Sequence, residues 1–220
     1  MASIGRRSAL RLIGAAPLTL GFGLTAAEAR LAHAHAEKAV KAATKGQLYK
    51  PGFFTPHEWQ TVRLLVDLIL PRDERSGSAT DAGVPEFMDF LMTDPMQDDR
   101  SRETRQTSMR GGLAWIDAEC HRRFGQDLAS CSAEQQRALL DEIAWSKVDE
   151  DDDEAQREPR EQRGVRLRHG PAFFSSFRDL TASGFWTSRM GVEDLGYLGN
   201  TATIWEGPPP EVLRKLGLDT

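Results

Sequence analysis

Apolar residues recur every three or four positions through much of this chain, which is the spacing of amphipathic helices. The clearest case begins at Thr55, where Pro56 fits the first helical turn and Glu58 stands three residues after the threonine. This arrangement predicts a capping box, in which each side chain bonds the backbone N–H of the other residue. The apolar positions that follow predict one helix up to about Leu70, and Pro71 ends it.

The same spacing predicts further helices along the chain. They begin near Pro85, Asp99, Ser132, residue 171 and Glu211. The longest covers about residues 99–124, with Gly125 as its C-cap. The glycine pair Gly111–Gly112 could kink this helix or split it in two. Gln135 stands in the capping-box position after Ser132.

An all-α fold is predicted, because no segment alternates polar and apolar residues over the length of a strand. One helical domain spans residues 55–183, after an N-terminal arm or linker at 30–54 whose alanine-rich start fits either a helix or a loose arm. Six consecutive acids and a run of mixed charge predict a solvated, mobile loop at 149–168. Glycines, aromatics and prolines mix without a period after residue 183, which predicts a long irregular arm at 184–220.

The N-terminal residues have the order of an export signal. Arg6 and Arg7 precede an apolar run at 12–24 that is shorter than the roughly 20 residues needed to span a bilayer. Ala27 and Ala29 then supply the small side chains that signal peptidase reads. We therefore expect residues 1–29 to be a twin-arginine signal that directs the folded chain to the periplasm. An uncleaved tether is the alternative.

Composition and motifs exclude several functions. The chain has 220 residues, a net charge of −5 and no concentrated basic stripe, which argues against nucleic acid as its partner. It has no GxGxxG, GxSxG or P-loop sequence, and its five histidines lack metal-ligand spacings. We therefore predict no catalytic, cofactor-binding or metal-binding residue in this chain.

Two cysteines, Cys120 and Cys131, bracket the corner between two predicted helices. In the oxidising periplasm such a pair is a candidate for a disulfide. Two buried thiols, or a bond to a partner chain, are the alternatives that the sequence leaves open.

Short motifs, rather than a catalytic signature, give the chain its resemblance to a known family. They are Phe54-Thr55-Pro56-His57-Glu58-Trp59, Ala82-Gly83-Val84-Pro85-Glu86-Phe87, Gly184-Phe185-Trp186-Thr187-Ser188, Asp194-Leu195-Gly196-Tyr197-Leu198-Gly199-Asn200-Thr201 and Trp205-Glu206-Gly207-Pro208. Together these motifs resemble those of subunit 3 of gluconate 2-dehydrogenase, the small subunit of that enzyme. The likeness covers most of residues 50–217, although little between about 95 and 170 takes part in it.

The resemblance implies a non-catalytic small (gamma) subunit of a periplasmic sugar dehydrogenase complex. The large partner in this family is a flavoprotein of the glucose–methanol–choline (GMC) type, which carries FAD and in some complexes an iron–sulfur cluster. Some complexes add a cytochrome c subunit, and association with the membrane then comes through the partners. The small subunit supplies the signal by which the Tat translocase exports the folded partner, and it aids that partner's maturation. The tail resembles the branch whose enzymes oxidise glycosides at the sugar 3-position.

Residues of the tail are the predicted contacts with this partner, since tryptophan and tyrosine are enriched at protein interfaces. They are Phe185, Trp186, Tyr197, Asn200 and Trp205. Packing of the tail aromatics on the chain's own helices is the other interpretation. Two rival functions also fit the sequence: a stand-alone periplasmic helical oxidoreductase or metal-binding protein, and an export chaperone that leaves its client after translocation.

Overall fold

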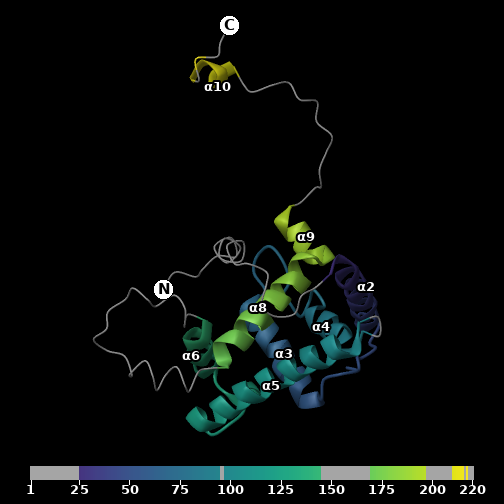
Figure 1. Cartoon of the computed structure of the whole chain (residues 1–220), viewed down its shortest axis with the longest axis vertical. Coiled ribbons are helices and arrows are strands. Elements are labelled where there is room, and N and C mark those ends of the chain that lie inside the picture. Colours follow the sequence, from purple (N-terminus) through teal and green to yellow (C-terminus); the bar gives the residue numbers. More distant parts are fainter. Residues whose placement is uncertain (1–24, 95–96, 145–168, 197–209, 216, 218–220) are drawn as a thin grey trace, which may run out of the picture.

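The computed structural model describes residues 25–94, 97–144, 169–196, 210–215 and 217, and its described elements are all helices (Figure 1). In chain order they are α2 (Ala26–Ala43), α3 (Pro56–Ile69), α4 (Val84–Thr93), α5 (Asp99–Phe124), the 3₁₀ turn η1 (Leu128–Ser130), α6 (Ala133–Ala144), α8 (Gly170–Trp186), α9 (Arg189–Leu195) and α10 (Pro210–Lys215). The predicted all-α fold is confirmed. The predicted charged loop at 149–168 lies outside the described residues.

Local sequence signals set several helix ends where they were predicted. At the start of α3, Glu58 N–H donates to Thr55 Oγ1 at 3.2 Å and Thr55 N–H donates to the Glu58 carboxylate at 2.8 Å. Ser132 and Gln135 exchange the equivalent bonds before α6, at 2.9 and 3.3 Å. Gly125 ends α5 in the left-handed conformation, with φ at 75°.

A buried carboxylate on α4, that of Asp89, fixes the loop that leads into α3. Its Oδ2 accepts hydrogen bonds from Gly52 N–H and from the Tyr49 hydroxyl, both at 2.8 Å. Its Oδ1 accepts from the N–H groups of Phe53 and Phe54, at 3.0 and 3.3 Å. Asp89 is only 2% exposed, and these bonds replace the water that the buried carboxylate has lost. Burial, together with the Asp89 carboxylate, raises the pKa of Tyr49, so its hydroxyl stays a donor.

Helix α8 is the centre of the core, and it packs against α3, α4, α5, α6 and α9 (Figure 1). Phe177, Leu180 and Phe185 on its buried face are each at most 2% exposed. Gly184 brings α8 close to α4, because a Cβ at this position would lie 3.0 Å from the Phe87 ring. The apolar face predicted for residues 171–183 therefore continues to the end of α8.

Residues 184–195 differ from the prediction, because they complete α8 and form α9 instead of starting an irregular arm. Ser188 caps α9 by accepting a hydrogen bond from Gly191 N–H at 3.1 Å. A Cβ at Gly191 would lie 2.0 Å from the Phe185 carbonyl oxygen, so glycine is required for the turn between the two helices. Glycines that suggest irregular backbone in the sequence are here positions of close packing.

The alanine-rich start of the predicted arm is also ordered. Residues 26–43 form α2, which packs along α4 (Figure 1). Ala32 and Ala36 are 0% and 2% exposed, and small side chains at these positions let the two helices approach. The sequence allowed either a helix or a loose arm at the start of this segment, and the structure shows a helix.

Replacing Asp89 tests whether its hydrogen bonds hold the α3 approach loop. We expect Asp89→Asn to lower the free energy of unfolding by about 3 kcal/mol, because the amide keeps one acceptor oxygen and turns an N–H₂ group toward buried backbone donors. Urea unfolding followed by circular dichroism measures the change. The matched control is Asp141→Asn on the exposed face of α6, for which we expect a change within about 0.5 kcal/mol. An equal loss in both variants would contradict this role of Asp89.

Candidate functional site

The predicted interface residues of the tail divide into two groups. Phe185 is fully buried in the chain's own core, so its side chain is not available to a partner. Its ring meets that of Trp186 edge to face, with the centroids 4.9 Å apart and an interplanar angle of 88°. Tyr197, Asn200 and Trp205 lie outside the described residues. Of the predicted interface residues that the structure describes, Trp186 is therefore the one near the surface.

Trp186 is half-buried and packs its ring on the core. The indole Nε1 is buried and has no hydrogen-bond partner among the described residues. Buried indole N–H groups usually have an acceptor. This N–H is thus a buried polar group to which the described residues offer no acceptor.

The turn after Trp186 is held by α2. The Thr187 hydroxyl donates to the Ser183 carbonyl and also contacts Nε2 of His33. Since the hydroxyl hydrogen is used for Ser183, Nε2 of His33 carries the hydrogen in the second bond. Burial lowers the pKa of His33, which favours this neutral ring, and the ring lies 4.6 Å from that of Phe87.

Arg75 fixes the end of α9 from the loop that follows α3. Its Nε lies 3.4 Å from Asp194 Oδ1, and its guanidinium also donates to the Asp194 carbonyl oxygen. The Asp194 side chain is only 3% exposed. The end of α9 is therefore held by the loop that follows α3.

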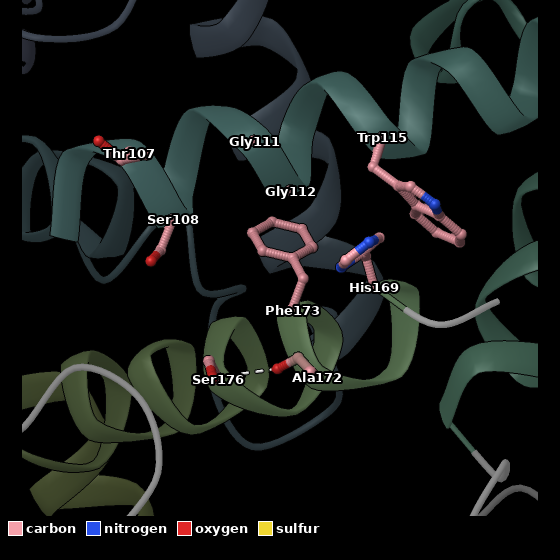
Figure 2. A pocket seen from close by; sticks show the side chains of 9 residues that line it. All are labelled: Thr107, Ser108, Gly111, Gly112, Trp115, His169, Ala172, Phe173 and Ser176. Carbon is pink, nitrogen blue, oxygen red and sulfur yellow. Dashed lines mark hydrogen bonds between the residues drawn. The ribbon is translucent and has the colours of Figure 1, made fainter. Parts of the chain in front are cut away.

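A surface pocket of about 390 Å³ lies between α5 and α8 (Figure 2). Figure 2 shows the Phe173 ring pointing from α8 toward Gly112 of α5, with His169 beside it and Trp115 at one end of the pocket. Three hydroxyl side chains complete the lining, those of Thr107, Ser108 and Ser176. The pocket thus combines aromatic surface with hydroxyl groups.

Glycine makes the helix crossing beneath this pocket possible. A Cβ at Gly112 would lie 1.9 Å from a ring carbon of Phe173, and one at Gly170 would lie 2.3 Å from the Trp115 ring. At Gly111, one residue earlier, a Cβ would meet nothing within 4 Å. The sequence left it open whether the glycine pair kinks or breaks the helix. In the structure α5 is continuous through the pair, and Gly112 is the glycine that packs against α8.

His169 is the one titratable side chain among the nine residues that line the pocket. None of its nine lining residues carries a carboxylate, so no acid pairs with His169 there. Within the described part of the chain, no three His, Cys, Asp or Glu side chains are placed to hold a metal ion. The pocket could not be predicted from the sequence, because the packing role of its glycine pair depends on a helix that is distant along the chain.

An acid–base pair does occur elsewhere, between His57 on α3 and Asp117 on α5. Their side chains lie 2.6 Å apart, and the hydrogen bond that His57 donates to the Asp117 carboxylate raises the pKa of His57. The other oxygen of Asp117 accepts from Leu128 N–H at 3.1 Å. Because Asp117 joins α3, α5 and η1, we interpret the pair as a structural link between these elements.

The two cysteines are free and adjacent in the structure. Cys120 and Cys131 are 0% and 7% exposed. Burial, and to a smaller extent the neighbouring Cys131, raises the pKa of Cys120 to about 12. A thiol with so high a pKa is a weak nucleophile at neutral pH. The disulfide between the two cysteines stays a prediction.

The predicted signal lies mostly outside the described residues, Arg6 and Arg7 included. Ala27 and Ala29 lie in the first two turns of α2. Of the described helices, none has the length and apolar character needed to cross a bilayer.

Comparison with models of known protein families gives a match to the family described as Gluconate 2-dehydrogenase subunit 3, over residues 56–207. The matched residues include α3, the pocket between α5 and α8, and α9. Comparisons with curated proteins and with solved structures find no match.

Two neighbouring glycines test the crossing beneath the pocket. We expect Gly112→Ala to lower the free energy of unfolding by about 3 kcal/mol, because its methyl group would overlap the Phe173 ring and force the helices apart. Gly111→Ala is the matched control and should instead raise it by about 0.5–1 kcal/mol, through the better helix propensity of alanine. Denaturant unfolding measures both changes, and equal effects would show that Gly112 has no special packing role.

Proposed function

The chain belongs to the gluconate 2-dehydrogenase subunit 3 family, and from this premise we propose that it is the non-catalytic small subunit of a periplasmic sugar or glycoside dehydrogenase. The family match over residues 56–207 carries the proposal. In this function a large GMC-type flavoprotein holds FAD and oxidises the sugar, with an iron–sulfur cluster or a cytochrome c subunit as further carriers of electrons. The small subunit itself holds no redox group.

The described surface supports a binding role in this complex. The pocket between α5 and α8 offers aromatic and hydroxyl groups without an acid–base pair. Trp186 presents a buried N–H group with no partner among the described residues. Both features suit contact with another protein, since interfaces are rich in aromatic side chains and satisfy polar groups across the contact.

Export is the second part of the proposed function. The pair Arg6–Arg7 is the mark of a route that carries folded proteins. A large subunit that binds its flavin before export needs such a route, and a signal on the small subunit can serve both chains. We propose that the two chains assemble in the cytoplasm and cross together to the periplasm.

Coexpression tests the assembly and export roles separately. We expect the large flavoprotein to be poorly flavinated and absent from the periplasm when the small chain is omitted. A variant with Arg6→Lys and Arg7→Lys should restore flavin content but leave both chains in the cytoplasm. Released flavin and dehydrogenase activity, measured in each cell fraction, give the result. A large chain that is fully flavinated and exported by itself would overturn the proposal, as would a metal or flavin bound to the purified small chain alone.

Trp186 tests the contact with the large subunit. Trp186→Phe keeps an aromatic ring but removes the indole N–H, and a lost hydrogen bond of about 1 kcal/mol should weaken association about fivefold. Trp59→Phe on α3, also half-buried, is the matched control and should leave association unchanged. Titration of the purified chains measures both affinities. Equal affinities for the two variants would remove Trp186 from the interface.

A further inference from the structure

Helix α2 begins inside the predicted export signal. Thr25 caps it, because its Oγ1 accepts from Glu28 N–H at 3.2 Å and its own N–H donates to Glu28 Oε2 at 2.8 Å. The Ala29 N–H donates to the Thr25 carbonyl oxygen at 3.0 Å. The small-residue site at Ala27 and Ala29, which a signal peptidase would read, is thus hydrogen-bonded helix.

Glu28 has a second role that reaches across the domain. Its other oxygen, Oε1, lies 3.4 Å from Nη2 of Arg105 on α5 and 3.4 Å from the amide nitrogen of Gln97. The Arg105 side chain is only 5% exposed and that of Glu28 only 16%. Burial alone would raise the pKa of Glu28, but the hydrogen bonds from Thr25 and the charge of Arg105 together lower it, so the carboxylate stays ionised.

The rest of α2 is built into the core. A Cβ at Gly83, before α4, would lie 3.3 Å from the Ala36 Cβ, so the two elements touch there. His33 stacks on Phe87 and bonds Thr187, which ties α2 to α4 and to the turn after α8. Helix α2 is therefore part of the folded domain and not an arm beside it.

Cleavage after Ala29 would remove Thr25 and Glu28 from this arrangement. The helix would lose its capping box, and Arg105 would lose a carboxylate partner in a site that is almost closed to water. Susceptibility to a protease depends on whether the backbone is exposed and free of hydrogen bonds. In a chain that crosses the membrane already folded, the backbone at Ala29 does not meet that condition.

We infer that the finished subunit keeps residues 25–29, so that the boundary between export signal and folded domain lies before Thr25 and not after Ala29. This inference rests on the proposed export. Glu28, part of the small-residue cleavage box in the sequence, is then a structural residue that joins the first helix to Arg105 of α5.

The N-terminus of the exported subunit tests the inference directly. The complex is purified from the periplasmic and membrane fractions, and the small chain is examined by intact mass and N-terminal sequencing. We expect an N-terminus at or before Thr25, with Glu28 retained. A chain that begins at Arg30 would overturn the inference. A chain found only in the cytoplasm would instead count against the proposed export. The stability of the variants below would then decide whether Glu28 belongs to the folded domain.

Variants of the full chain test the structural role of Glu28 without any export. Glu28→Gln keeps a capping side chain but removes the charge that faces Arg105, and Glu28→Ala removes both. We expect melting temperatures lower by about 4 °C and about 7 °C, respectively. Glu37→Gln, on the exposed side of α2 where Glu37 pairs with Lys41, is the control and should shift the melting temperature by no more than about 1 °C. Unchanged melting temperatures in both Glu28 variants would overturn the inference.

Discussion

Close packing around α8 depends on glycine where α4, α5 and α9 meet it. Gly112 of α5 faces Phe173, and Gly170 at the start of α8 faces Trp115. Gly184, near the end of the same helix, lies against Phe87 of α4, and Gly191 lies on the Phe185 carbonyl. A side chain at any of these positions would have to displace a ring or the backbone. Because α8 touches α3, α4, α5, α6 and α9, the positions of most other helices follow from these contacts.

The same constraint shapes the surface that we assign to binding. The pocket lies beside the two close contacts of α5 with α8, which are those of Gly112 with Phe173 and of Trp115 with Gly170. At the other end of α8, Gly191 lets the first turn of α9 lie against the Phe185 carbonyl. The neighbouring Trp186 packs its ring on the core, and its N–H has no partner among the described residues. Both features of the binding surface are thus consequences of how α8 is packed, and neither depends on a catalytic group.

Sequence alone predicted those features that neighbouring residues determine. The capping pairs Thr55–Glu58 and Ser132–Gln135 and the C-cap Gly125 act within a few residues, so their patterns indicate helix ends directly. The extent of α8 and the existence of α9 could not be predicted in this way, because Gly184 and Gly191 are explained only by partners on other elements. Asp89 was equally inconspicuous: an acid within an apolar helix shows its role only when the loop at 49–54 folds onto it.

Export in the folded state, as proposed, places a requirement on the start of the domain. The first helix must be complete while the signal is still attached, so its cap has to come from residues that adjoin the signal. Thr25 and Glu28 meet this requirement, since their reciprocal hydrogen bonds close the end of α2 without any group that precedes Thr25. The bond that Arg105 donates to Glu28 then connects that first turn to α5, which is far away in the sequence. A signal joined at this point can engage the translocase while the domain behind it keeps every contact of its native fold.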